Sequence, residues 1–263
     1  MNLIKAHAFG NDFLLVHARD VESVADRAAL AREVCDRHRG VGADGLILFE
    51  ASNRAASMRL LNADGSPSEV SGNGVRCLAA WIASTQKLDR GAIVSVRTDA
   101  GDKALELLDE RDGRYTFRAA MGHPESIARE IIDVNGEGVE AVTLRVGNPQ
   151  CVVIGEVSQA RLHSVAAALA VHSRFPEGTN VELARVVQPN HVRILIWERG
   201  VGPTEASGTG ACAAAAAAIR YAGASRDVAI ESPGGTQRVE WNDDGLFLTG
   251  WAELIADSRW LKR

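Results

Sequence analysis

The chain has 263 residues, of which 46% are hydrophobic, and its formal net charge is −5 at pH 7. This length is enough for two domains of ordinary size or one large one, and the interspersed charges argue against a nucleic-acid partner. No segment reaches eighteen apolar residues and the N-terminus has no signal-peptide pattern, so we expect a cytoplasmic protein without a membrane partner.

The spacing of the cysteines and histidines favours neither a metal site nor a disulfide framework. The four cysteines show no Cys-x-x-Cys pattern. The seven histidines include no His-x-x-His or His-Glu-x-x-His cluster. We therefore expect no bound metal ion.

Hydrophobic periodicity in the first half of the chain predicts short strands and two helices. Strands are expected at residues 3–16 (interrupted by a Gly-Asn turn), 46–49, 57–61 and within 91–119. Helices are expected at 26–37 and 74–85, the second directly after a Gly-rich turn.

The second half repeats this plan. Strands are expected near 142–146, 151–155, 180–187 and 192–198, with more strands toward the end of the chain. Helices are expected near 158–171 and 210–221, and the second again follows a Gly-rich turn directly.

The repeat extends to individual polar residues. Ser-Gly-Asn-Gly begins at Ser71, and Ser-Gly-Thr-Gly begins at Ser207, 136 positions later. Three further matches occur at nearly the same offset: Asn62 with Glu198, Gly10-Asn11 with Gly147-Asn148, and Gly42-Ala43-Asp44 with Gly178-Thr179-Asn180. Such agreement predicts two similar lobes. We expect them at residues 1–119 and 120–263, and the last strand could return to the first lobe.

The two helices that follow the Gly-rich turns are apolar on every side. Residues 211–219 comprise seven alanines, one cysteine and one isoleucine, and residues 78–82 are similar. A helix that is apolar all round must be buried all round. We therefore predict an α+β fold of two pseudo-symmetric lobes, each a curved, mostly antiparallel sheet around a central helix whose N-terminus points toward the cleft between the lobes.

The N-terminus of each central helix is a candidate anion site, because unpaired backbone N–H groups and the helix dipole favour carboxylates there. Ser71 and Ser207 could alternatively be simple N-caps, but capping does not require the matching residue nine positions upstream. A rival nucleotide-binding motif, Gly40–Gly45, follows a helix and precedes a strand, the reverse of the dinucleotide fingerprint. Neither serine lies in Gly-x-Ser-x-Gly, which disfavours a serine hydrolase.

Polar side chains beside the predicted strand ends suit a zwitterionic ligand. Asparagine offers both donors and acceptors without charge, and Glu198-Arg199 supplies one partner of each sign. Each residue taken alone could be an ordinary turn asparagine or a solvated ion pair. Two lobes with one reactive position each suit proton transfer on both faces of one atom, as an epimerase without a cofactor requires.

Along essentially the whole chain, the sequence resembles the diaminopimelate epimerase family. The matching stretches are His7–Phe13, Gly40–Leu46, Asn62–Ser66, Gly72–Cys77, Gly147–Pro149, Gly178–Glu182, Glu198–Gly202 and Gly208–Cys212. The resemblance implies two related lobes and a homodimer. It also implies interconversion of LL- and meso-diaminopimelate without pyridoxal phosphate or metal, on the route to lysine and peptidoglycan.

In that family two cysteines, one from each lobe, flank the substrate Cα; one removes a proton and the other returns one. The resemblance assigns these catalytic positions to Ser71 and Ser207. It implies that the substrate α-carboxylate is held by the backbones of Gly72, Asn73, Gly208 and Thr209. Further substrate contacts are implied at Asn11, Asn62, Asn148, Asn180, Glu198 and Arg199.

The chain departs from the family at both catalytic positions. A cysteine titrates near pH 8.5, whereas the pKa of an unassisted hydroxyl is closer to water's value of about 16, a gap of roughly 10 kcal/mol. Gln150 stands where the family usually has histidine, and Gly45 where some members have a polar residue. Cys77 and Cys212 lie within the apolar helices, so we expect core positions rather than a catalytic pair.

Two explanations of the serines stay open. The chain is either a Cys→Ser double variant made to trap substrate or a natural divergent member, and Gln150 favours divergence. Three functions follow: a diaminopimelate epimerase with little or no turnover, an amino-acid-binding protein without catalysis, or an isomerase or dehydratase of the same superfamily with another substrate.

Overall fold

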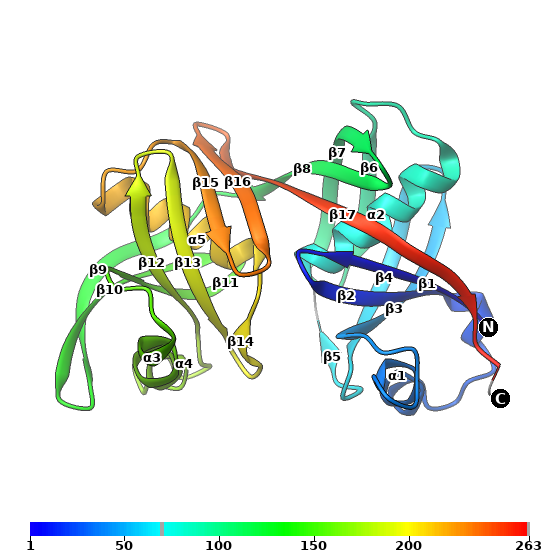
Figure 1. Ribbon diagram of the computed structural model, residues 1–263, viewed down its shortest axis with the longest axis horizontal. Helices are drawn as coiled ribbons and strands as arrows, with labels where there is room; N and C mark the ends of the chain where they lie inside the picture. Colours follow the sequence, from blue (N-terminus) through cyan, green and yellow to red (C-terminus); the bar gives the residue numbers. More distant parts are fainter. Residues whose placement is uncertain (69–70, 262–263) are drawn as a thin grey trace. The chain divides into compact units, whose positions relative to one another are not determined.

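The computed structural model describes residues 1–68 and 71–261. Contacts between Cα atoms divide the chain into two compact units (Figure 1). The first unit contains Met1–Ala119 and the chain from Gly250 onward, and the second contains Ala120–Thr249. The mixed α/β fold class predicted from the sequence is confirmed, with strands surrounding one long apolar helix in each unit.

The first unit is built on a closed ring of eight paired strands. They pair in the order β1, β2, β3, β4, β6, β7, β8 and β17, and β17 pairs back to β1. Their bounds are β1 Asn2–Ala8, β2 Asn11–His17, β3 Gly45–Ser52, β4 Ala55–Asn62, β6 Ile93–Thr98, β7 Gly101–Arg111, β8 Arg114–Gly122 and β17 Gly245–Arg259. The short β5 (Pro67–Ser68) pairs with β4.

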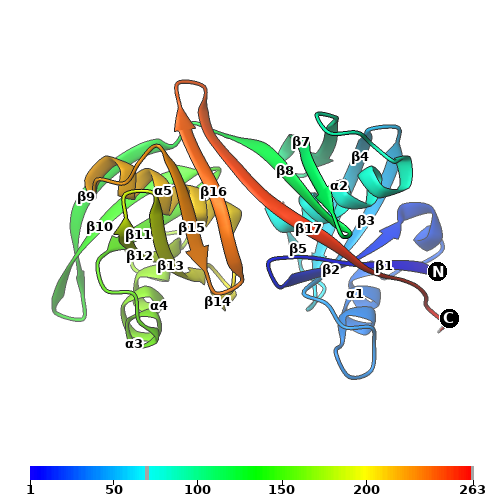
Figure 2. The same ribbon diagram turned by 45° about the horizontal axis from the view of Figure 1, so that its top comes forward.

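The helix α2 (Gly72–Gln86) contacts strands from several sides of this ring, as Figure 2 shows. Residues 77–80 are all buried because the sequence offers no polar face there, and the buried Arg76 donates a hydrogen bond to Asn73 Oδ1. A 3₁₀ turn (η1, Ala18–Val21) and the helix α1 (Arg27–Cys35) connect β2 to β3 and pack against the other face of the strands.

The second unit repeats the pairing scheme. Its strands are β9 Glu125–Val134, β10 Glu137–Val146, β11 Asn148–Ile154, β12 Asn180–Gln188, β13 His191–Glu198, β14 Gly202–Thr204, β15 Asp227–Ser232 and β16 Gly235–Asn242, followed by β17. The series β10, β11, β12, β13, β15, β16 and β17 alternates between antiparallel and parallel pairs in the same way as β1, β2, β3, β4, β6, β7 and β8.

The helix α5 (Gly208–Tyr221) is the counterpart of α2. The run from Ala211 to Ala218 is buried, and it packs on β-branched and leucine side chains of the surrounding strands. Because alanine adds little width, the strands approach the helix backbone closely. Even-numbered residues of β11 and β12 face α5, and odd-numbered residues face the second layer formed by α3, η2 and α4.

The structure also corrects details of the predicted elements. The helix expected near 158–171 consists of α3 (Gln159–Arg161), a π-helical turn (η2, Leu162–Ala166) and α4 (Ala167–Ala170). The strand β9 was not anticipated, because most of its residues are exposed or half-buried and show no strong apolar alternation. Within the described residues, every helix is too short or too polar to cross a bilayer.

Candidate active site

The first group of predicted site residues lies at the N-terminus of α2. Ser71 has an extended backbone and caps the helix, because its Oγ accepts a hydrogen bond from the Gly74 backbone N–H at 3.1 Å. The serine is half-buried, and a Cβ placed on Gly72 would meet no other atom within 4 Å. The backbone of this first turn is therefore accessible to a ligand.

Two asparagines meet beside this turn. The Asn73 side chain is buried and donates from Nδ2 to Asn11 Oδ1 at 3.2 Å, while its own Oδ1 accepts from Arg76. Asn11 in turn donates to Asp44 Oδ2 at 2.8 Å. This chain of bonds orients both amides, with the oxygen of Asn11 toward α2.

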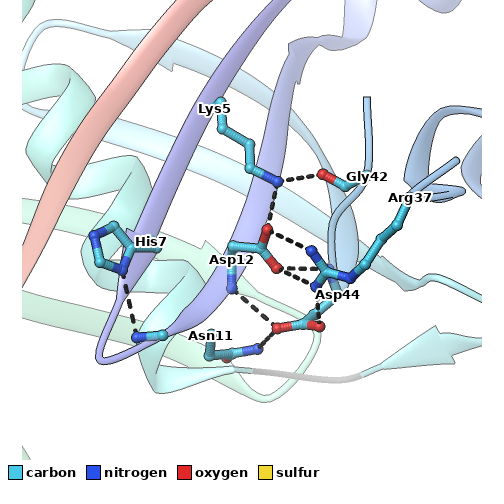
Figure 3. Close-up of polar contacts among 8 residues, drawn as sticks. Lys5, His7, Asn11, Asp12, Arg37, Gly42 and Asp44 are labelled. Atoms are coloured by element: carbon cyan, nitrogen blue, oxygen red, sulfur yellow. Dashed lines mark hydrogen bonds and ion pairs between the residues drawn. The ribbon is translucent and has the colours of Figure 1, made fainter. Parts of the chain in front are cut away.

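A cluster of charged side chains lies beside Asn11 and holds it through Asp44 (Figure 3). Arg37 donates to Asp12 Oδ1 and to Asp44 Oδ1, each at 2.8 Å, and Lys5 bonds both Asp12 and the Gly42 carbonyl. Burial alone would raise the pKa of Asp12, but the hydrogen bonds and charges of Arg37 and Lys5 lower it to about 2. Two cations thus balance two carboxylates.

Asn62 ends β4 on the sheet face that α2 covers, opposite Gly45 of β3. Its Nδ2 donates to Ser66 Oγ at 3.0 Å, and its backbone N–H donates to the Ser66 carbonyl at 2.8 Å. Asn62 is therefore a turn residue as well as a candidate ligand contact.

The second group of predicted site residues lies at the N-terminus of α5 and begins with the same cap. Ser207 accepts a hydrogen bond from the Gly210 backbone N–H at 3.2 Å, and Thr209 Oγ1 lies 3.5 Å from its hydroxyl. Ser207 and Gly208 are buried, whereas Thr209 is partly exposed.

Glu198 is the acidic group beside Ser207. Burial raises the pKa of the Glu198 carboxyl, and the nearby hydroxyls of Ser207 and Thr204 partly oppose that effect. Glu198 is the last residue of β13 and is half-buried. Its counterpart in the first unit is the neutral Asn62.

Asn180 is held beside Arg199, the residue that follows Glu198. Asn180 Oδ1 accepts a hydrogen bond from the Arg199 backbone N–H at 2.9 Å. The exposed Arg199 guanidinium is held by the Glu177 carbonyl at 2.9 Å. On the neighbouring strand, Asn148 Oδ1 accepts from Gln150 Nε2, and the pairing Gln150↔Asn180 brings these amides to one strand end.

The predicted site residues therefore gather into two groups, one in each unit. Two further sets of side chains were not assigned a role from the sequence. The first is the charged cluster of Lys5, Asp12, Arg37 and Asp44. In the sequence, Asp12 lies in the matching stretch His7–Phe13 and Asp44 in the repeated Gly42-Ala43-Asp44, whereas Lys5 and Arg37 lie in neither. The second is Glu182, a fully buried acid beneath α5.

The cysteines take no part in either group. Cys77 and Cys212 are completely buried, as expected for core residues, and burial raises the pKa of the Cys77 thiol to about 12. Within the described residues, the four cysteines form no disulfide. In the part of the chain that the structure describes, no three His, Cys, Asp or Glu side chains are grouped as metal ligands.

Each group combines a hydroxyl, a positive helix N-terminus and nearby amides. This combination can bind a carboxylate through backbone N–H groups and can place a hydroxyl beside the bound molecule. The second group adds a carboxylate suited to an ammonium.

Known proteins match this chain along its length. The family model "Diaminopimelate epimerase" matches residues 3–127 and 142–255. The diaminopimelate epimerase of Desulforudis audaxviator is 38% identical over 279 residues, covering 100% of both chains. A solved structure titled a predicted epimerase, from Pseudomonas aeruginosa, shares the fold with a TM-score of 0.76 at 16% identity, covering 100% of this chain and 99% of its own.

A probable proline racemase from Agrobacterium radiobacter has the same fold, with a TM-score of 0.72 at 16% identity over 99% of this chain and 92% of its own. Likeness at this identity concerns the fold alone, whereas the family model and the full-length relative concern the sequence itself. The chain belongs to the diaminopimelate epimerase family.

Proposed function

We propose that this protein binds diaminopimelate and retains the framework for two-base epimerisation at its Cα, with Ser71 and Ser207 in the two acid/base positions. The repeated Ser cap, found at the N-terminus of both central helices in a chain that matches the family throughout, is the observation that supports the proposal. Each cap leaves a hydroxyl beside backbone N–H groups.

The remaining residues would divide the substrate between them. The backbones of Gly72, Asn73, Gly208 and Thr209 would hold the α-carboxylate at the positive helix ends. Glu198 would receive the ammonium. Asn11, Asn62, Asn148, Asn180 and Arg199 would complete the contacts, with no requirement for pyridoxal phosphate or metal. We also propose a cytoplasmic homodimer, as the resemblance to the family implies.

Turnover by the serine chain should be slow or absent. Gln150 stands two residues after Asn148, at the position where the family usually has a histidine that could act as a general base. Without such help a hydroxyl lies about seven pKa units above a thiol, which corresponds to roughly 10 kcal/mol. A binding protein without catalysis is therefore the second candidate function, and it is favoured by serine at both positions.

Proton exchange at Cα tests the proposal. LL-diaminopimelate in D2O is given to the chain and to the variant Ser71→Cys/Ser207→Cys, and loss of the Cα–H signal is followed by NMR. Exchange and meso product with the cysteine variant alone would support an intact pocket without its bases. Exchange by the serine chain would show that the hydroxyls are activated. If neither protein exchanges the proton or binds the amino acid, the diaminopimelate assignment is wrong.

A further inference from the structure

The two units differ at one position beneath the first turn of the central helix. In the first unit, a Cβ placed on Gly74 would lie 3.0 Å from Ile47 Cδ1. In the second unit, a Cβ placed on Gly210 would lie 2.6 Å from Glu182 Oε1. The same place in the repeat is therefore occupied by an aliphatic side chain in one unit and by a carboxyl group in the other.

Strand register supports this equivalence. Ile47 pairs with Leu15 and Leu60 on its two neighbouring strands, and Glu182 pairs with Val152 and Ile196. Since the first unit folds with isoleucine here, packing alone does not require an acid. Packing therefore does not explain why the second unit has a carboxyl group at this position, and we look for a role in ligand binding.

Glu182 is completely buried, and neither of its oxygens receives a hydrogen bond from another residue among those described. The titratable groups around it are Glu198 on β13 and Cys151 on β11. The hydroxyl of Ser207, the N-cap of α5, lies beside the same Gly210 position. Glu130 of β9 acts on the same cysteine. Of these groups, the two glutamates have the same sign as Glu182, and burial together with Glu198 raises its pKa well above the ordinary value.

Glu182 and Glu198 lie on the same face of the sheet. Glu182 pairs with Ile196, and Glu198 is two residues farther along β13, so the two carboxyl groups are diagonal neighbours on the face toward α5. Glu198 extends from this position to the hydroxyl of Ser207. Ionising both acids would place two negative charges under the helix end that the proposed function assigns to an α-carboxylate.

We infer that Glu182 is a positioning residue that stays protonated at neutral pH, so that the pair carries a single negative charge on Glu198. One charge attracts the ammonium of a zwitterionic amino acid and leaves the N-terminus of α5 available for its carboxylate. Ionisation of Glu182 adds a second charge and opposes carboxylate binding. The link to ligand affinity rests on the proposed function, whereas the protonation of Glu182 does not.

The protonation state is measured directly by ¹³C NMR of protein labelled at the glutamate side-chain carboxyl carbon. The expected result is one carboxyl signal that is still protonated at pH 7 and disappears in Glu182→Gln. Glu182→Ile, which copies the residue of the first unit, is the matched second variant in case the amide disturbs packing. If every glutamate signal of the unmodified chain has the shift of an ionised carboxylate at pH 7, the inference is wrong, whatever the protein binds.

Calorimetric titration with LL-diaminopimelate from pH 6 to 9 then measures the effect on the ligand. Affinity of the unmodified chain should fall relative to both variants as Glu182 ionises, by up to about tenfold per pH unit. Comparison at equal pH removes the titration of the amino acid itself. Identical pH profiles for all three proteins would overturn the positioning role. Absence of binding by all three would instead overturn the proposed function, and the carboxyl signal would still decide the protonation state.

Discussion

The two halves of the chain carry the same serine cap on their central helices but support it with opposite chemistry. Beside α2, the polar residues are amides held by a charge-balanced cluster of Lys5, Asp12, Arg37 and Asp44, and the position beneath the helix is the apolar Ile47. Beside α5, the fully buried Glu182 and the half-buried Glu198 form an acidic pair. The repeated fold therefore supplies the helix ends, while the residues beneath them differentiate the two halves.

Moving the acid into the first half should have the largest effect. Ile47→Glu places a carboxyl group in an apolar site with no partner prepared for it, and we expect a loss of about 3–5 kcal/mol in the free energy of unfolding at pH 7. Urea denaturation measures it, with Ile47→Val as the control, expected to lose about 0.5–1.5 kcal/mol. Stability equal to that of the unmodified chain would contradict the difference between the halves.

Removing the acid from the second half should stabilise the protein, increasingly so at higher pH. The pKa of Glu182 is raised in the folded state above its ordinary value of 4.5, so the folded form retains a proton that the unfolded form has lost. Stability of the unmodified chain therefore falls as pH rises above 4.5, by up to about 1.36 kcal/mol per pH unit until Glu182 ionises. The variant Glu182→Ile should lack this pH-dependent loss of stability. A constant stability difference between the two proteins from pH 5 to 8 would argue against it.

The charged cluster of the first half should have the opposite pH dependence. The pKa of Asp12 is lowered from 3.8 to about 2, so its contribution is complete above pH 3.8 and is lost as pH falls toward 2. After allowance for solvent screening, we expect Asp12→Asn to lose about 1–2 kcal/mol at pH 7 and to approach the unmodified chain at low pH. Asp102→Asn, which removes the exposed ion pair with Arg97, is the control and should change stability by about 0.5 kcal/mol or less.

The smallest effect concerns the feature that the halves share. Ser71→Ala and Ser207→Ala each remove a helix cap, and each should lose about 1 kcal/mol in the free energy of unfolding. Thermal denaturation of the two variants compares them directly. A change for one variant only would show that just one of the serines acts as a cap.

The repeat and both caps could be predicted from the sequence because Gly-rich turns, flanking asparagines and all-apolar helices are local signals. The role of Glu182 could not be predicted, because its structural equivalence to Ile47 depends on strand register. At the constant offset of 136 residues, Ile47 corresponds to Leu183, another aliphatic residue. The pairing of β12 with β11 and β13 shifts the match by one residue to Glu182, which faces α5, whereas Leu183 faces the outer layer. Because the separation between Ile47 and Glu182 is one residue shorter than the constant offset, a comparison at that offset does not align the two residues.

The charged cluster beside Asn11 could not be predicted for a similar reason. Lys5 and Arg37 lie far apart in the sequence and meet only because β1, β2 and the segment after α1 are neighbours in the fold. Asp12 and Asp44 lie within motifs that could be recognised from spacing, whereas Lys5 and Arg37, which pair with them, lie outside those motifs.

Epimerisation by single and double cysteine variants tests the central claim most directly, namely that each half supplies one acid/base position. Conversion of LL- to meso-diaminopimelate is measured for Ser71→Cys, for Ser207→Cys and for the double variant, with the unmodified chain as the reference. The account predicts substantial product from the double variant and little from either single variant, because both faces of Cα need an ionisable group. A single variant as fast as the double one, or a silent double variant that still binds the amino acid, would contradict it.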